Sequence, residues 1–432
     1  MRRLLPLLIV LLAAGVGAMR AGAMKQVPGD FLRYHRAGRL VVTGRAERLY
    51  DMKFLATQAV YAQEREPGKL TEYEFKYAPA LAVMMAPLGA LPPRAANVIW
   101  CAWNAALMAG MFLVLWRWCA AGLPAWSMLW MLVPIVVLLR PILDNVNNGQ
   151  VNPAAIVPAT IGAWLLSRGR DRTGGALVGF GAAVKFMPGV LALWFAWKRR
   201  WRALGACVAV VVVLWVALPT AVFGPSKALA LNEAWIDARA HHFTSAASDD
   251  LPGYSVKSFV YRLLGSTPYH VDDRDTGERS TVNVGADVLD PGALRTLTIV
   301  LDVILVLTAL WLCRGPVRDA SDPRGPPEAA LMLALLPLVS PEARYPHFLF
   351  LALPLTALTF ALVRDRGPSP ARRTVLALTV LGAVFVNATS DKLFGKSLGL
   401  LAEVYCVPGW GALLLFTALA LLVRDARRTQ AA

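Results

Sequence analysis

The chain of 432 residues is 57% hydrophobic and 17% charged, and its formal net charge is +16. A soluble domain normally carries about 25% charged residues, so the composition excludes an ordinary soluble protein. The five cysteines form no C-x-x-C pair, which excludes a disulfide framework or a cysteine metal site as the organising feature. We therefore expect an all-α polytopic membrane protein.

Apolar stretches of nearly membrane-spanning length recur along almost the whole chain. In chain order they cover 4–18, 95–116, 124–143, 151–166, 174–197, 201–223, 296–313, 329–339, 348–363, 375–388 and 398–423. A shorter apolar stretch, 81–91, is predicted to be an interfacial hairpin or another crossing. We expect a single membrane domain over 1–432 that contains about 10–13 transmembrane or re-entrant helices.

The basic residues gather in short loops between the apolar stretches. Examples are 168–172, 198–202 and 424–428. Because cytoplasmic loops are rich in Lys and Arg, this pattern predicts a cytoplasmic N-terminus in a cytoplasmic (inner) membrane. The same pattern lacks interleaved aromatic residues, so we expect no nucleic-acid partner.

Two long polar segments, about 19–76 and 224–293, are then predicted to be external loops. Residues 1–23 also resemble a signal peptide. We expect them to be retained, because their removal would shift the predicted topology. His241 and His242 are predicted to be solvated loop residues, and so is His35.

The stretch 174–197 has the length of one helix but contains Lys185 three residues before Pro188. A single crossing would place the basic loop 198–202 outside, against the charge rule. Proline also breaks helices. We therefore predict two half-length helices that turn back near Lys185, facing protein or a water-filled cavity.

A polar segment, 140–153, separates two of the apolar stretches. Its side chains include Asp144, Asn145, Asn148, Gln150 and Asn152. Carboxamides and carboxylates are costly to bury in hydrocarbon, so this cluster indicates a function. Its donors and acceptors suit a hydroxyl-rich or phosphate-bearing ligand. The alternative is that these residues only cap helices and form turns.

Asp30 lies beyond the first apolar stretch, in the first predicted external segment. A carboxylate there is able to act as a general base toward an acceptor hydroxyl. The alternative is a helix N-cap, which Asp favours.

Short motifs in a fixed order resemble those of glycosyltransferase family 87. They are Asp30-Phe31, Tyr34, Gly44, Leu49-Tyr50-Asp51, Tyr77-Ala-Pro79, Asn148-Gly-Gln150-Val-Asn152, Lys185, Pro188, Ser340-Pro341 and His347. The resemblance implies a GT-C-like helical bundle with external loops. It also implies transfer of a hexose, with mannose expected, from a polyprenyl-phosphate donor to a lipid or glycan acceptor at the external face. Two positions depart from the family pattern: Phe186 follows Lys185, and a single His347 stands where paired histidines are common.

The resemblance implies that Asp30 is the catalytic base. Lys185, Arg344 and His347 are candidates for the donor phosphate, because the leaving phosphate gains charge as its bond to the sugar breaks. Candidates for binding the sugar or acceptor are Tyr34, Asp144, Asn145, Asn148, Gln150 and Asn152. Without a dense cluster of His and Asp ligands, we expect no cofactor and no required metal.

Other readings remain open for the site and for the whole chain. Lys185 also suits a structural cation, and Arg344 and His347 suit ordinary loop residues. A secondary transporter or flippase of a lipid-linked or polyol substrate would also have broken helices, but should show two related halves. A lipid-binding scaffold would not need a carboxylate at Asp30.

Overall fold

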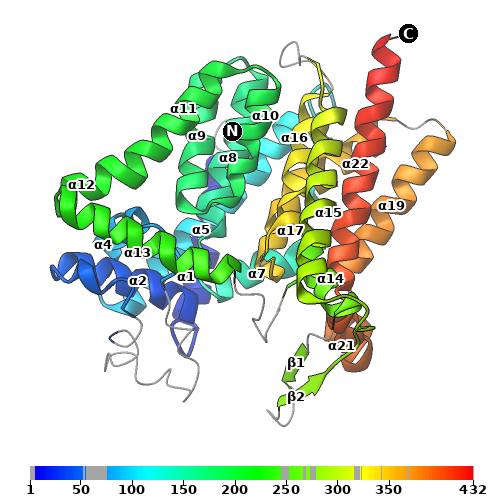
Figure 1. Ribbon diagram of the computed structural model, residues 1–432. Helices are drawn as coiled ribbons and strands as arrows, with labels where there is room; N and C mark the ends of the chain where they lie inside the picture. Colours follow the sequence, from blue (N-terminus) through cyan, green and yellow to red (C-terminus); the bar gives the residue numbers. More distant parts are fainter. Residues whose placement is uncertain are drawn as a thin grey trace.

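The structure is a computed structural model that describes residues 5–51, 54, 75–244, 253–265, 269–272, 279–315, 322, 324–341, 343–365, 367 and 369–431. Figure 1 shows a bundle of helices in which segments far apart in the sequence lie side by side. The first elements are α1 (Leu5–Gly22), α2 (Gly29–Val42), η1 (Ala46–Arg48), α4 (Pro79–Gly89), α5 (Pro93–Cys119), η4 (Ala125–Met131), α6 (Leu132–Val137), α7 (Leu139–Asn147), α8 (Asn152–Ser167), α9 (Asp171–Val184), η5 (Met187–Gly189) and α10 (Val190–Trp197).

The later elements complete the bundle. They are α11 (Trp201–Val212), the π-helix η6 (Val213–Ala217), α12 (Leu218–Phe223), α13 (Pro225–Thr244), α14 (Val256–Leu264), β1 (Tyr269–Asp272), β2 (Arg279–Val282), α15 (Pro291–Leu312), α16 (Gly325–Ala334), α17 (Leu336–Val339), η7 (Tyr345–Leu351), α18 (Ala352–Arg364), α19 (Pro370–Val386), α20 (Asp391–Phe394), α21 (Lys396–Val404) and α22 (Val407–Ala431). The two strands form an antiparallel hairpin with Tyr269 opposite Val282.

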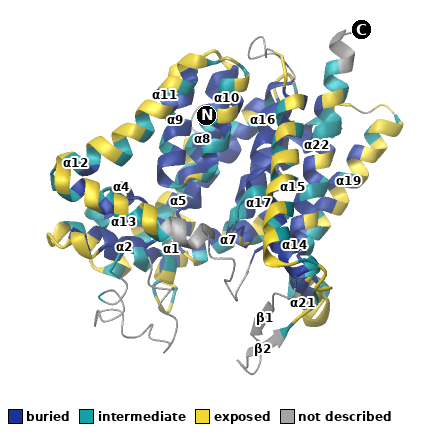
Figure 2. Cartoon of the chain, viewed as in Figure 1, coloured by how far each residue is buried: buried dark blue, intermediate teal, exposed yellow. Residues whose placement is uncertain are grey.

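Among the described residues, six helices are long and apolar enough to cross a membrane, and a bent pair makes a possible seventh. They confirm the predicted all-α polytopic membrane fold. The span of η7 and α18 is 83% buried, whereas those of α11–α12 and α15 are only 11% and 17% buried. Figure 2 shows the exposed outer faces of α11, α15 and α19 around the buried α16. Outer faces this apolar suit contact with lipid.

The predicted break near Lys185 is confirmed. Helix α9 ends at Val184, Lys185 is extended with φ −150° and ψ 118°, and α10 follows after η5. The Nη1 atom of Arg200, beyond α10, lies 2.7 Å from the Oδ1 atom of Asp171, at the start of α9. The two ends of the segment are therefore adjacent, and the segment is a hairpin.

The predicted apolar stretch 124–143 is not a straight helix. The chain instead bends by 61° between the η4–α6 unit and α7. Pro141 has no N–H for the carbonyl of Val137, four residues earlier, and its ring crowds that carbonyl. The Nδ2 atom of Asn387 donates to the Val137 carbonyl at 3.0 Å. The predicted stretch 398–423 is likewise divided, because Cys406, at φ 55°, separates α21 from α22.

The predicted first external segment contains helix α2, which packs against the short apolar helix α4. A Cβ on Gly38 would lie 2.3 Å from the carbonyl oxygen of Met85, so only glycine permits this approach. The Nε2–H of His35 donates to the carbonyl of Leu91 at 2.9 Å. His35 is fully buried, which corrects the prediction of a solvated residue. Burial also lowers the pKa of His35.

Two other parts of the predicted external segments lie partly or wholly outside the described residues. Residues 55–74 lie outside the described residues. His241 and His242 belong to helix α13, and their side chains also lie outside the described part of the structure.

The turn between α7 and α8 packs directly on α2. Gly149 has φ +63°, and a Cβ built there would lie 2.5 Å from the Cβ of Phe31. The indole Nε1 of Trp100, on α5, donates to the Gly149 carbonyl at 2.9 Å. Gly149 therefore fixes the separation between the 140–153 segment and the start of α2.

The basic loops meet at one end of the bundle. The Nζ atom of Lys198 donates to the carbonyl of Gly315 at 2.6 Å and lies 2.5 Å from a carboxylate oxygen of Glu328. Arg427 approaches the same carboxylate at 3.9 Å. This clustering suits the predicted positive side of the membrane, although the side itself stays a prediction.

We expect Arg202, in the first turn of α11 just after the Lys185 hairpin, to face the cytoplasm. A membrane-impermeant maleimide should therefore not label an Arg202→Cys variant in intact cells. The five native cysteines are buried, so they should give little background. Glu47→Cys, in the predicted external segment, is the labelled control. Equal external labelling at positions 202 and 47 would contradict the predicted sidedness.

We expect Gly149→Ala to lower the free energy of unfolding by roughly 1–3 kcal/mol, because it adds backbone strain and a clash with Phe31. Gly169→Ala is the matched control, since Gly169 has φ +73° with nothing within 4 Å of a built Cβ. The difference between the two variants, measured by thermal unfolding in detergent, isolates the clash. Equal losses of stability would show that the approach to Phe31 is not required.

Candidate functional site

Asp30 lies in the first turn of α2, where Pro28 holds the N-cap position and no side chain caps the helix. Its Oδ1 atom accepts a hydrogen bond of 2.8 Å from Nη1 of Arg33. Its Oδ2 atom accepts from Nε2 of Gln150. The N-cap alternative is therefore wrong. The carboxylate points toward the 140–153 segment, and its side chain is 24% exposed.

Aromatic side chains pack around the first turn of α2, which carries Asp30. Tyr34 is buried, and its hydroxyl lies 3.1 Å from the hydroxyl of Tyr77, with the two rings edge to face. Burial raises the pKa of Tyr34. Phe31 and Trp100 pack against each other beside this pair, with ring centroids 6.1 Å apart. These contacts fix the first turn of α2.

The turn at 148–152 presents Gln150 to Asp30. Its backbone carbonyl accepts a hydrogen bond of 3.0 Å from Nδ2 of Asn104, on α5. Asn148 is exposed at the end of α7. The turn interpretation of this segment is thus correct for the backbone, while the side chain of Gln150 reaches another helix.

Two buried carboxamides form a relay behind the turn. Asn145 Nδ2 donates to the carbonyls of Pro141 and Pro346, at 2.7 and 2.8 Å. Asn145 Oδ1 accepts from Nδ2 of Asn152 at 3.0 Å. Because these bonds fix the orientation of both amides, Oδ1 of Asn152 is left facing Lys185, whose Nζ atom donates to it at 2.6 Å.

Lys185 also meets His347. Its Nζ atom lies 2.6 Å from Nε2 of His347, and the backbone N–H of Arg344 donates to Nδ1 at 2.8 Å. Since Nδ1 accepts, a neutral imidazole carries its proton on Nε2. A protonated lysine and an Nε2–H are both donors, so both are able to donate to an acceptor placed against the two nitrogens. An anion has that property.

The structure thus joins half of the predicted site residues into two contacts. Asp30 meets Gln150, and Lys185 links Asn152 to His347. Only Val151 separates the two in the 148–152 turn. Asp144 is half-buried on α7, and Arg344 is exposed at the start of η7. Tyr34 is buried and is not part of these two contacts.

Some residues of the cluster are absent from the sequence-based prediction. Arg33 follows Asp30 at the i,i+3 spacing of a helical ion pair, which is a usable signal. Arg140 stacks over the ring of Tyr345, with its Cζ atom 4.1 Å from the ring centroid, and donates to Thr389 at 2.7 Å. Thr389 is far away in sequence, so no local pattern reveals that contact.

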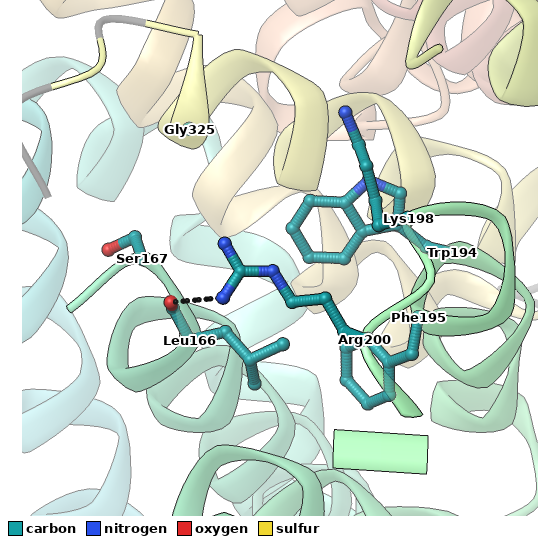
Figure 3. A pocket seen from close by; sticks show the side chains of 7 residues that line it. All are labelled: Leu166, Ser167, Trp194, Phe195, Lys198, Arg200 and Gly325. Atoms are coloured by element: carbon teal, nitrogen blue, oxygen red, sulfur yellow. Dashed lines mark hydrogen bonds between the residues drawn. The ribbon is translucent and has the colours of Figure 1, made fainter. Parts of the chain in front are cut away.

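A cavity lies at the other end of the Lys185 hairpin (Figure 3). Its lining residues are Leu166, Ser167, Trp194, Phe195, Lys198, Arg200 and Gly325. Helix α9 has 14 residues, which separates this end from Lys185 by about 20 Å. In Figure 3 the guanidinium of Arg200 donates to the Leu166 carbonyl, at 3.2 Å. The cavity is distinct from the Asp30 and Lys185 cluster.

No group of three His, Cys, Asp or Glu side chains within the described ranges is arranged to hold a metal ion. The Nζ atom of Lys185 and the Nε2–H of His347 are donors, which suit an anion with hydrogen-bond acceptors.

Comparison with known proteins bears on the identity of this cluster. Residues 75–341, more than half of the chain, match Glycosyltransferase family 87. The matched region includes the 140–153 segment and Lys185, whereas Asp30 and His347 lie outside it. The comparisons with curated proteins and with solved structures found no match. With a family match of this extent, the chain belongs to glycosyltransferase family 87.

Proposed function

We propose that this glycosyltransferase moves a hexose, mannose being the expected sugar, from a polyprenyl-phosphate donor to the hydroxyl of a lipid or glycan acceptor. The reaction inverts the anomeric carbon and takes place at the external face of the membrane. The observation that carries the proposal is the pair of nitrogen atoms of Lys185 and His347, held 2.6 Å apart beside the carboxamide of Asn152.

This pair suits the phosphate of the donor. Two donor groups that face each other are able to share one acceptor, and phosphate oxygens are strong acceptors. As the bond between the sugar carbon and the phosphate oxygen breaks, its electron pair stays on the phosphate. Lys185 and the Nε2–H of His347 stabilise that charge, and the exposed Arg344 adds a second cation.

Asp30 is proposed as the general base. The acceptor oxygen forms its bond to the anomeric carbon on the side opposite the phosphate, and its proton passes to the carboxylate. Arg33 and Gln150 hold the two carboxylate oxygens in place, which fixes the direction from which the acceptor approaches. The partial exposure of Asp30 leaves it accessible to a hydroxyl.

The polar segment then divides between two tasks. Gln150, Asn148 and Asp144 are proposed to contact the sugar or the acceptor. The amide groups of Asn145 and Asn152 are committed to protein partners, so we assign them the positioning of Lys185 and of the chain beside His347. Tyr34 is assigned a positioning role, because its contact with Tyr77 helps to fix the helix turn that carries Asp30.

We expect Asp30→Asn to lower turnover by about 10²- to 10⁴-fold with donor binding retained, because asparagine keeps the shape of the side chain but cannot accept the proton. The measurement is sugar transfer by purified protein at saturating donor, with donor affinity measured separately.

Asp51→Asn is the matched control for this substitution. Asp51 forms an ion pair of 2.6 Å with Arg48 at the same three-residue spacing, outside the proposed site. It should transfer sugar at nearly the wild-type rate. Near wild-type turnover by Asp30→Asn would remove Asp30 from the mechanism.

A further inference from the structure

The helix break at Lys185 leaves a backbone carbonyl without its helical partner. In a continuous helix the carbonyl of Ala183 would accept the N–H of Met187, four residues later. The extended conformation of Lys185 turns the chain away before Met187. A carbonyl left unsatisfied in an apolar bundle destabilises the fold, so another donor is required.

Trp215 supplies that donor. Its indole Nε1–H donates to the Ala183 carbonyl at 3.0 Å. The indole also stacks on Phe186, with ring centroids 6.5 Å apart and planes 23° apart. Trp215 therefore contacts the chain on both sides of Lys185, through a hydrogen bond before it and a ring contact after it.

The backbone around Trp215 is also irregular. Trp215 lies within the π-helix η6, which interrupts the long helix from α11 to α12. Such π-turns release backbone carbonyls and are frequent at functional sites. The Trp215 carbonyl accepts a hydrogen bond of 3.1 Å from Nδ2 of Asn232, and Trp235 packs edge to face on the indole. Both of these residues belong to α13, which therefore holds Trp215 in place.

We infer that Trp215 is a positioning residue for the donor site, where its indole N–H replaces the missing helical donor and fixes the backbone from which Lys185 projects. The inference rests on the proposed role of Lys185 at the donor phosphate. It extends that site to α13, since Asn232 and Trp235 act on Lys185 through Trp215.

Trp215→Phe tests the inference. Phenylalanine keeps a ring between Phe186 and Trp235 but cannot donate to Ala183. We expect faster backbone hydrogen exchange over residues 183–189 and a donor KM raised by roughly two- to tenfold, the range expected for loss of one hydrogen bond. The acceptor KM should stay unchanged, which separates positioning of Lys185 from a general loss of folding.

Trp194→Phe is the matched control. Trp194 is a buried tryptophan on α10, in the same hairpin, and its Nε1 makes no hydrogen bond within the described residues. It should leave exchange over 183–189 and the donor KM at wild-type values. Lys185→Met completes the set and should raise the donor KM at least as far as Trp215→Phe.

The set separates failure of the inference from failure of the proposed function. Exchange over 183–189 that is no faster in Trp215→Phe than in Trp194→Phe would overturn the role of Trp215. Faster exchange in Trp215→Phe, with the donor KM unchanged there and in Lys185→Met, would support the backbone role of Trp215. That second result would at the same time overturn the assignment of Lys185 to the donor phosphate.

Discussion

The fold depends on one constraint, that backbone polar groups freed by helix breaks must find partners inside an apolar bundle. Pro141 removes the helical partner of the Val137 carbonyl, and Asn387 replaces it. The break at Lys185 frees the Ala183 carbonyl, and Trp215 replaces its partner. In both cases a side chain from a distant segment makes irregular backbone tolerable. These breaks are where the chain displays the polar segment and Lys185.

The candidate site depends on the same kind of contact, in which a side chain satisfies a backbone group of a distant segment. Asn145 satisfies the carbonyl of Pro346 and, through Asn152, orients the amide oxygen that faces Lys185. One buried carboxamide thus links the α7–α8 segment to the start of η7 and to the Lys185 hairpin. Asp30 is brought to the same turn by the approach of Gly149 to α2. Three segments that are remote in sequence therefore meet at one short turn.

The sequence predicts features that have local causes. Hydrophobic content predicts the helical membrane fold, and the combination of Lys185 with Pro188 predicts the break that the structure contains. Pro141 gives the same kind of local signal, and the chain bends by 61° just before it.

Features set by distant partners were not predictable in the same way. The burial of His35 has no local signal in the sequence, because its partner, the Leu91 carbonyl, lies 56 residues away. Likewise, no local pattern reveals the contact between the Asp30 carboxylate and Gln150, which lies 120 residues away. We propose that these contacts build a site for sugar transfer from a lipid phosphate. Purified protein in detergent, without any gradient, should transfer radiolabelled sugar from a polyprenyl-phosphate donor to an acceptor hydroxyl. Movement of an intact lipid-linked substrate across reconstituted vesicles, with no transfer from any donor in a panel, would contradict it.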